Sequence, residues 1–528
     1  MSLSKRCCVL FLGVTIVAVV WRVPRLQQRP MHGDEAIHAE KFGYLLEQGV
    51  YTYDPIEYHG PTLNYLSLIP AWLSSAQKLT EVTEITLRIV PVFFGVLLVL
   101  LPLLVADGLG RIATVVAAGL TAVSPAMVFY SRYYIMEILL VCFTFGVIIC
   151  GYRYARSRSL PWMILTGVCV GLMHATKETC IIAFGSLLSA LLMLMIWQRK
   201  RYGPCVTAAK PIRPWHFVVG LASAAVVSVL FFSSFFTHPS GILDSFRTYA
   251  TYFGRASDNP IHIHPWYYYL KVLLFSRYEG GPAWSEASIV LLAVAGFVVA
   301  ITNKGLRGAD SGLLKFIALY TVIMTVAYSA IPYKTPWCML GFLHGMILLA
   351  GVGAAAMIRL APSILPRIVI AGLLLSSGAH LAWQAYLANY VYYADSRNPY
   401  VYAHPTTEVF TIVERVNELA QVHPDGRHMY IQVICPGRDY WPLPWYLRAF
   451  TNVGWWQYVP EDVPVAPVII ASGEVEGALT RKLYEQTPFE KRKMYLYLFD
   501  KPYYVWLRPK IKLIGLVRKD LWDLWQGR

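Results

Sequence analysis

The sequence predicts a polytopic α-helical membrane protein that ends in a C-terminal extracytoplasmic α/β domain. Of its 528 residues, 56% are hydrophobic and only 15% are charged, whereas about a quarter of a soluble protein is charged. Apolar runs near the ~20 residues that cross a bilayer recur up to about residue 388 and then stop. We therefore expect a transmembrane domain over residues 1–388 and a second domain over residues 389–528.

The apolar runs predict eleven spans. They lie near residues 7–21, 86–106, 112–129, 138–154, 161–176, 179–197, 215–236, 287–302, 315–331, 337–358 and 367–388. The first follows Lys5 and Arg6 and has the outline of a signal peptide. Because it lacks a small-x-small cleavage site and further spans follow, we interpret it as a retained helix.

Basic residues in short loops predict the orientation, because such residues stay on the cytoplasmic side. A cytoplasmic N-terminus keeps one set of them inside: Arg156, Arg158, Arg199, Lys200, Arg201, Lys210, Arg213, Lys304, Arg307, Arg359 and Arg367. An odd number of spans then places the C-terminal domain outside the cytoplasm. The protein is thus expected to be a multi-pass membrane protein with its N-terminus in the cytoplasm.

The outer face collects the polar and aromatic sequence. In the first outer loop, about 22–85, residues 35–48 have helical spacing and a stop at Gly49, which fits an amphipathic helix in the interface. The run 61–76 is short and bounded by proline, so we expect a second interfacial helix; if it spanned the membrane, the topology would shift. The long loop 237–286 contains HIHPWYYYLKVLLFSRYEGGPAWSE. Its aromatic density fits either a headgroup-level belt or a lipid-sugar groove.

The terminal region has the pattern of a small α/β domain. PTTEVFTIVERVNELAQ places Val409, Ile412, Val413, Val416 and Leu419 on one helical face. HMYIQVI, VAPVIIAS, KMYLYLF and YYVWLRP are typical of strands. The domain has no nucleotide-binding glycine motif, and with its lone Cys435 it cannot contain a disulfide framework.

The net charge of +15 does not indicate nucleic-acid binding. No recognition motif accompanies the charge. Basic residues that hold loops on one side of a membrane and meet anionic lipid headgroups explain it better.

Asp34 and Glu35 are the first candidates for chemistry. Adjacent carboxylates at a helix start are commonly a cap and a first-turn acid. Alternatively, one of them is a general base for an acceptor hydroxyl or amide at the membrane surface. His32, Asp34, His38 and His59 also leave a divalent metal possible, but their spacing is no specific metal signature. We therefore assign no metal ligands and no certain cofactor.

Cations recur at the outer helix ends. Arg132 and Glu137 occur in YSRYYIMEILL, and they form either a structural pair or a site in which Arg132 meets a phosphate and Glu137 a sugar hydroxyl. His174, Lys177 and Glu178 occur in and just before ATKET, and Lys334 in IPYKTPW. Snorkelling explains a lone lysine. Together, the cations Arg88, Arg132, Lys177 and Lys334 would form a cradle for a phosphate leaving group.

Several of these segments resemble the landmarks of a bacterial and archaeal membrane family. They are HGDEAIHAE, YSRYYIME, ATKET, HPWYYYLKVLLFSRYEGGPAWSE, IPYKTPW, RNPYVYAHP and WPLPWYLR. The family is described as flippase-activity-associated and is similar to the protein O-mannosyltransferases and aminoarabinose transferases of the GT-C superfamily. It commonly has Asn-Asp after the Tyr-Ser-Arg element, where this chain has Ile135, Met136 and Glu137.

The resemblance implies a GT-C fold and an inverting glycosyltransferase that uses a polyprenyl-phosphate-sugar lipid. It also implies that the protein lies in the inner membrane of a bacterium or archaeon. Asp34 would be the base and Glu35 would support it. A donor site would hold the phosphate and sugar through Arg88, Arg132, Glu137, His174, Lys177, Glu178 and Lys334. An acceptor groove would include His59, His264, Trp266, Arg277 and Glu279. The acceptor itself, a glycan, lipid or protein, is left open. Two alternatives make no bonds: a component of lipid-linked sugar transport, and an assembly scaffold.

Overall fold

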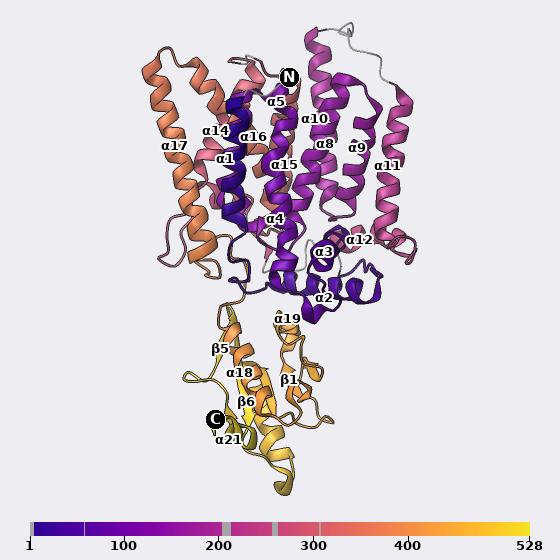
Figure 1. The fold of residues 1–528 in the computed structure, drawn as a ribbon, viewed down its shortest axis with the longest axis vertical. Helices are drawn as coiled ribbons and strands as arrows, with labels where there is room; N and C mark the ends of the chain where they lie inside the picture. Colours follow the sequence, from indigo (N-terminus) through magenta and orange to yellow (C-terminus); the bar gives the residue numbers. More distant parts are fainter. Residues whose placement is uncertain (1–4, 58, 203–212, 256–261, 306–307, 528) are drawn as a thin grey trace.

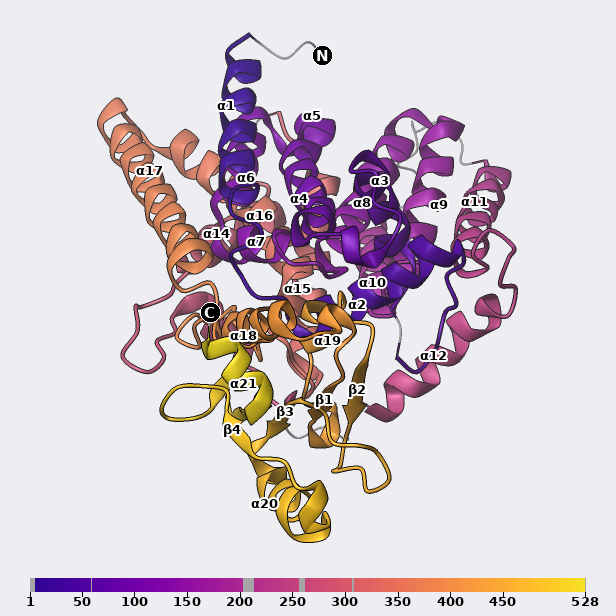
Figure 2. The ribbon, with the colours of Figure 1, turned by 60° about the horizontal axis from the view of Figure 1, so that its bottom comes forward.

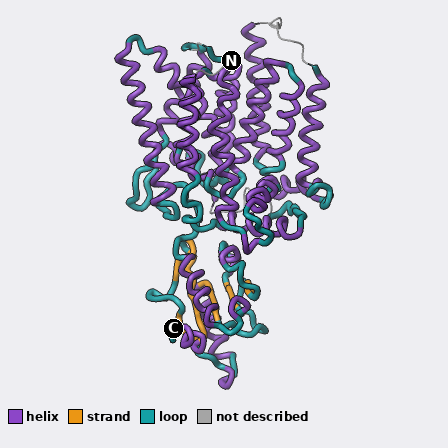
Figure 3. The backbone as a smooth tube through the Cα atoms, in the orientation of Figure 1, coloured by secondary structure: helices purple, strands orange, loops and turns teal. Residues whose placement is uncertain are grey.

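The computed structural model consists of a layer of long helices with a smaller domain beneath it (Figure 1). It describes residues 5–57, 59–202, 213–255, 262–305 and 308–527. Strands occur in the lower domain, and the layer above it is built of helices (Figure 3). The predicted basic residues Lys210 and Arg307 lie outside the described residues.

The helices of the layer match the predicted spans. Seven apolar helices in the described residues are long enough to cross a bilayer: Glu84–Leu109, Glu137–Ser157, Cys180–Lys200, Pro214–Phe232, Ser311–Ala330, Pro336–Leu360 and Ile364–Val391. Arg111–Val123 and Pro125–Ser131 form a pair bent by 59°, and Val9–Arg22, Leu160–His174 and Ala287–Thr302 are shorter apolar helices. These positions coincide with the eleven predicted spans, and the chain is an integral multi-pass membrane protein.

In the labels of Figure 1, these helices are α1, α4 to α11 and α14 to α17. Their bounds are α1 Lys5–Arg22, α4 Glu84–Leu100, α5 Ala106–Leu109, α6 Arg111–Val123, α7 Pro125–Ser131, α8 Glu137–Ser157, α9 Leu160–His174, α10 Cys180–Tyr202, α11 Pro214–Phe232, α14 Ala287–Thr302, α15 Ser311–Ala330, α16 Leu340–Leu360 and α17 Ile364–Tyr386. A short turn of helix, Leu387–Val391, extends α17.

Short helices lie at the lower edge of the layer. They are α2 Gly33–Gln48, α3 Thr62–Leu73, α12 Gly241–Arg255 and α13 Tyr268–Leu274. The predicted stop of α2 is confirmed: Gly49 has φ 74° and donates its N–H to the Leu45 carbonyl, which a residue with a Cβ would do only under strain. With 12 residues, α3 is about 18 Å long, too short to cross a bilayer. It lies across the base of the layer, as expected for an interfacial helix (Figure 1).

The N-terminus and the lower domain lie at opposite ends of the helical layer (Figure 1). This arrangement agrees with an odd number of spans. Which end faces the cytoplasm stays a prediction from the basic loops.

The terminal domain is an α/β domain, as predicted. Its helices are α18 Val409–Val422, α19 Leu443–Tyr446, α20 Glu476–Thr480 and α21 Lys519–Gln526, and its strands are β1 Ile431–Ile434, β2 Val453–Trp456, β3 Val468–Ser472, β4 Tyr495–Tyr497, β5 Val505–Arg508 and β6 Ile511–Arg518. The sheet has the order β2-β1-β3-β6-β4, with β5 also paired to β6. β1 is parallel to β2 and β3, whereas β6 is antiparallel to its neighbours.

Helices cover both faces of this sheet. Val409, Ile412, Val416 and Leu419 of α18 are buried against one face together with Leu521 of α21. Leu479 and Leu483, in and after α20, pack on the other face. Figure 2 shows α18 and α21 on one side of the sheet, with α20 at the end of the domain far from the membrane layer. The domain thus has its own hydrophobic core on each side of the sheet.

Two connections fix the terminal domain beneath the membrane layer. The chain leaving α17 first returns toward the layer, so that Tyr400 is completely buried among membrane-domain residues. Further along, the Tyr446 hydroxyl accepts the Met31 N–H at 2.8 Å, and Trp445 donates to Glu84 at 2.8 Å. Arg448 donates to the carbonyls of Leu79 and Val82. The domain is therefore anchored on the first outer loop.

Candidate active site

The start of α2 is held by a reciprocal cap. The Asp34 N–H donates to Nδ1 of His32 at 3.0 Å, and the His32 N–H donates to the Glu35 carboxylate at 3.0 Å. Because Nδ1 accepts, Nε2 of His32 carries the proton that is donated to the Tyr402 carbonyl at 3.0 Å. Burial lowers the pKa of His32, so the imidazole stays neutral. The expected start at residue 35 is thus two residues late, and the cap is His32 and not an acid.

Glu35 is a buried structural carboxylate. It accepts bonds from Arg88 Nε at 2.8 Å and from a terminal nitrogen of Arg88 at 2.7 Å, and from the Tyr134 N–H at 2.8 Å. Burial alone would raise the pKa of Glu35, but the guanidinium groups of Arg88 and Arg29 lower it below its ordinary value. With His32 as the fourth donor, every acceptor position of Glu35 is used within the protein.

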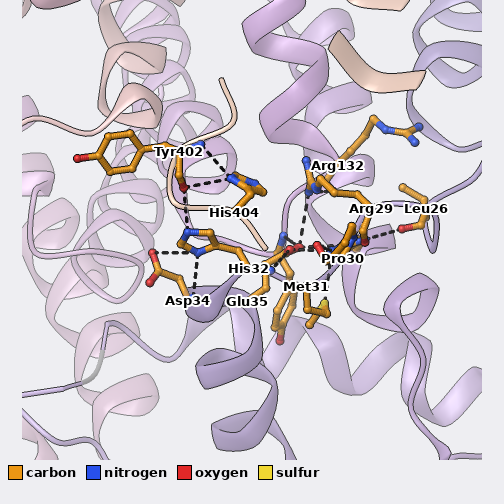
Figure 4. A network of polar contacts seen from close by, with 12 residues as sticks. Leu26, Arg29, Pro30, Met31, His32, Asp34, Glu35, Arg132, Tyr402 and His404 are labelled. Carbon is orange, nitrogen blue, oxygen red and sulfur yellow. Dashed lines mark hydrogen bonds and ion pairs between the residues drawn. The ribbon is translucent and has the colours of Figure 1, made fainter. Parts of the chain in front are cut away.

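Asp34 points the other way. Figure 4 shows Asp34 beside His32, whereas Glu35 turns toward Arg29 and Met31. The Asp34 side chain is 46% exposed, and its nearest charged or imidazole partner is Nδ1 of His32 at 3.8 Å. Since that nitrogen already accepts a hydrogen bond, the contact is not an ion pair. Asp34 is therefore the carboxylate of the two that an acceptor molecule can reach.

Aromatic rings form a wall beside Asp34. The ring centroids of Tyr133, Trp337 and His404 lie 5.5, 6.0 and 4.8 Å from that of His32. Tyr402 continues the wall, 5.9 Å from Trp337. Tyr133, Trp337 and His404 are buried, so Tyr402 is the part of this wall that a sugar ring beside Asp34 could reach.

A second group of polar residues forms where the first outer loop meets the turn between α9 and α10. His59 Nδ1 lies 2.8 Å from the Glu178 carboxylate, which also accepts the Tyr53 hydroxyl at 3.3 Å. The approach depends on Gly60: a Cβ there would lie 2.2 Å from the Ala175 carbonyl oxygen. The Thr62 N–H and hydroxyl both donate to that same carbonyl. Because Gly60 has no side chain, the first outer loop can pack closely against the turn between α9 and α10.

Lys177 forms an ion pair with Glu137, and both side chains are buried. A structural pair of Arg132 and Glu137 was one of the two predicted alternatives. The structure corrects it, because Arg132 bonds to the Arg22 carbonyl and the Tyr390 hydroxyl instead. The second oxygen of Glu137, Nδ1 of His38 and the Tyr133 hydroxyl are buried without a hydrogen-bond partner among the described residues. Burial, the adjacent His59 and the charges of Lys41 and Lys177 hold the pKa of His38 well below its ordinary value. Buried polar atoms of this kind are satisfied when a polar ligand binds.

A narrow apolar cavity begins at Glu137. It runs between α8, α10, α15 and α16 and is lined mainly by Leu140, Val141, Tyr320, Met324, Tyr328 and Trp337. An adjoining cavity shares Val141, Thr144, Tyr320 and Gly341 and continues to His344. Apolar space therefore starts directly beside the Lys177–Glu137 pair.

The predicted cradle of cations is split into two groups. Arg88 lies against Glu35 and also donates to the carbonyls of Leu26 and Arg29 at 2.6 and 2.8 Å. Arg132 donates to the Arg22 carbonyl at 2.9 Å and to the Tyr390 hydroxyl at 3.2 Å. Lys177 belongs to the other group, where it pairs with Glu137. The hydrogen-bond partners of these cations depend on how the loops pack against one another, and no local sequence pattern predicts that packing.

The other predicted site residues are more scattered. Lys334 donates to the carbonyls of His264 and Ile331. His264 stacks on Tyr268 at 4.3 Å, beside the aromatic wall through Tyr402. His174 contacts Ser228 at 2.6 Å between α9 and α11, so it does not join His59.

Three residues of the predicted acceptor groove lie at the surface. Trp266 is 66% exposed. Arg277 donates to the Gly281 carbonyl at 2.9 Å, and Glu279 accepts from Ser396 at 3.3 Å. Both therefore belong to an exposed hairpin that contacts the segment after α17.

Within the described residues, no group of three or more His, Cys, Asp and Glu side chains is placed to hold a metal ion. Sequence reasoning overlooked Arg29, which lies 3.7 Å from Glu35, and the wall residues Tyr402 and His404. The segment RNPYVYAHP was a signal for the latter two. Its position after the last span assigned it to the terminal domain.

Comparison with known proteins confirms the fold. Residues 65–240 match the family model described as dolichyl-phosphate-mannose-protein mannosyltransferase. ArnT from Cupriavidus metallidurans in the apo state superposes with a TM-score of 0.61 at 14% identity, covering 98% of this chain and 99% of ArnT. ArnT bound to undecaprenyl phosphate gives a TM-score of 0.61 at 13% identity, over 97% of this chain and 98% of ArnT.

The oligosaccharyltransferase of Archaeoglobus fulgidus, tethered with an acceptor peptide, gives a TM-score of 0.52 at 13% identity and covers 85% of this chain. The chain spans 64% of that protein's length. No protein of curated function matches the sequence. The mannosyltransferase and aminoarabinose transferase resemblance is thereby confirmed as a shared GT-C fold. The flippase-associated assignment stays a prediction.

Proposed function

We propose that the protein transfers a sugar from a polyprenyl-phosphate donor to an acceptor on the extracytoplasmic face. The observation that carries the proposal is the contrast between two neighbouring carboxylates. Glu35 is buried and used by four donors, whereas Asp34 is half-exposed beside an aromatic wall. A site that needs one general base and one rigid support has this arrangement.

In the proposed reaction Asp34 takes the proton from an acceptor hydroxyl or amide. The acceptor oxygen or nitrogen then bonds to the anomeric carbon, and the bond from that carbon to the phosphate oxygen breaks. The electron pair leaves with the lipid phosphate, which carries the negative charge away. Direct displacement by the acceptor inverts the anomeric centre. Glu35 positions Asp34 because it fixes the first turn of α2 against Arg88.

The phosphate is proposed to lie near His59 and Lys177. Buried polar atoms of His38 and Glu137 lack partners there among the described residues, and cations near a departing phosphate stabilise the transition state. When the donor binds, the Lys177 ammonium group would contact the phosphate as well as the Glu137 carboxylate. The terminal domain, docked on the first outer loop, would help to select the acceptor.

The test is mass spectrometry of the lipids that copurify with the gently solubilised protein. Wild-type protein is expected to carry polyprenyl phosphate, the product of transfer, and an Asp34→Asn variant the glycosylated donor. The matched control is Asp54→Asn, in the same outer loop, whose oxygen accepts the Ile56 N–H at 2.7 Å, a bond that asparagine can keep. If wild type and Asp34→Asn retain the same glycosylated lipid, Asp34 is not the base, and a transport or scaffold role takes the place of transfer.

A further inference from the structure

The second group of cations surrounds a cavity of its own. Arg25, Arg29, Arg88 and Arg132 line it together with Leu26, Phe129, Asn389 and Tyr393; we call this the arginine pocket. Four guanidinium groups and no carboxylate face it. Among the described residues, the only carboxylate paired with any of them is Glu35. The pocket therefore carries a large excess of positive charge.

One buried donor in the pocket is still available. Arg88 and Arg132 are used by backbone carbonyls, but Nε of Arg29 is buried without a partner among the described residues. Arg29 itself is only 6% exposed and donates one bond, to the Arg132 carbonyl at 2.6 Å. Arg25 stands exposed at the edge of the pocket, with φ 53°. The Tyr393 hydroxyl adds a neutral donor.

The electrostatics of the arginine pocket suit an anion. Burial lowers the pKa of Arg29 to about 10 and that of Arg132 to about 10, although Glu35 raises the first and Tyr390 the second. For Arg88, by contrast, the paired Glu35 carboxylate offsets burial, so burial disfavours the charge mainly at Arg29 and Arg132. A bound anion would reverse this effect.

The pocket lies at the level of lipid headgroups. Arg132 joins the end of α1, through the Arg22 carbonyl, to the end of α17, through Tyr390. Trp21 packs on Tyr386 and Tyr390 with ring centroids 6.4 and 6.2 Å apart, and Tyr386 is 40% exposed. Aromatic residues at the ends of apolar helices mark the membrane–water interface.

We propose that the arginine pocket binds the phosphate group of an anionic phospholipid, at a site separate from the donor site beside Lys177. Guanidinium groups present paired donors that match phosphate oxygens. One phosphate oxygen would enter between Arg29 and Arg132, and Arg25 would close over the others. A bound lipid would thus join α1, α7 and the end of α17 behind Glu35. Free phosphate shares this chemistry, so the test separates the two sources.

The experiment uses the full chain in a neutral detergent. Native mass spectrometry measures retention of phosphatidylglycerol against phosphatidylcholine, and thermal unfolding is followed with each lipid and with inorganic phosphate. The variants are Arg25→Gln and Tyr393→Phe, which remove an exposed charge and one hydroxyl and leave the buried core intact. Arg247→Gln is the control, because Arg247 is 71% exposed and would report only general attraction to headgroups.

Wild-type protein is expected to retain one phosphatidylglycerol and to gain thermal stability from it. Arg25→Gln should weaken that binding about tenfold or more, the effect of losing one charged hydrogen bond, and Arg247→Gln should not. Protection by inorganic phosphate that is lost in Arg25→Gln, without selective lipid retention, would support the anion site and identify free phosphate as its source. No preference for either anion, or equal losses in Arg25→Gln and Arg247→Gln, would overturn the proposal.

Discussion

Replacing Glu35 by glutamine tests whether Glu35 stabilises the structure around Asp34 or acts on the substrate itself. In the native protein the two carboxylate oxygens accept four hydrogen bonds, two from Arg88 and one each from the Tyr134 and His32 backbone. Glutamine keeps one carbonyl oxygen and presents an amide that itself donates, so two donors lose their acceptor. The variant also leaves Arg88 and Arg29 without a negative partner.

The expected cost of Glu35→Gln follows from these contacts. Removing one partner of a buried ion pair costs about 3–5 kcal/mol, because the remaining charge stays buried and unpaired. Two lost hydrogen bonds to charged or backbone donors, at about 1–3 kcal/mol each, give a similar figure. We therefore expect the free energy of unfolding to fall by about 3–5 kcal/mol.

Unfolding in mixed micelles with increasing sodium dodecyl sulfate, followed by tryptophan fluorescence, measures this change. Glu40→Gln is the matched control on the same helix, since its carboxylate accepts only a long bond of 3.4 Å from Tyr44. Asp34→Asn should unfold like wild type. If Glu35→Gln were as stable as wild type and also accumulated glycosylated donor lipid, Glu35 would act on the substrate directly, and its supporting role would be refuted.

Three further predictions concern pH, a glycine and a lysine. The folded-state pKa of Glu35 lies below its ordinary 4.5, so its stabilising effect is complete above that pH and is lost as pH falls from 4.5 through the folded value. Acid unfolding curves should show this loss in wild type and not in Glu35→Gln. Gly60→Ala should disrupt docking of the first outer loop and accelerate its proteolysis, because the new Cβ would overlap a backbone carbonyl; Gly151→Ala, with open space around it, should have no effect. Lys177→Met should lower the free energy of unfolding by about 3–5 kcal/mol, and Lys177→Met/Glu137→Gln should recover much of it. Thermal unfolding of the two variants checks the last prediction.

Local patterns predicted the elements of this fold well. Apolar runs located the spans because each helix must satisfy its own backbone in lipid. Gly49 ended α2 because the left-handed cap needs no Cβ. The strand β6, by contrast, was overlooked although it is eight residues long. Gly515 interrupts its apolar pattern, and the reason lies in tertiary packing: a Cβ there would lie 2.8 Å from the Phe499 ring.

The site itself was predicted residue by residue but not as an arrangement. Lys177 and Glu178 are adjacent in sequence, yet one pairs with Glu137 and the other with His59, 40 and 119 residues away. Arg132 turned out to cap the end of α1 and to stack on Tyr390 at 4.9 Å. These pairs form where loops that are distant in sequence come into contact. The spacing of residues along the sequence does not predict which loops come into contact.

The different fates of Asp34 and Glu35 follow from helix geometry. Successive residues of an α-helix point about 100° apart, so two adjacent carboxylates cannot serve the same face. Here Glu35 turns toward Arg88 and fixes α2 to the membrane layer, and Asp34 lies on the other side, beside His32. The same bond that makes Glu35 unavailable to a substrate therefore holds Asp34 at the place where a base is needed. The buried pair of Glu35 and Arg88 is therefore best understood as the structural support of Asp34. The arginines of the pocket behind this pair outnumber the single carboxylate of Glu35, so an anion from the membrane would stabilise the support further.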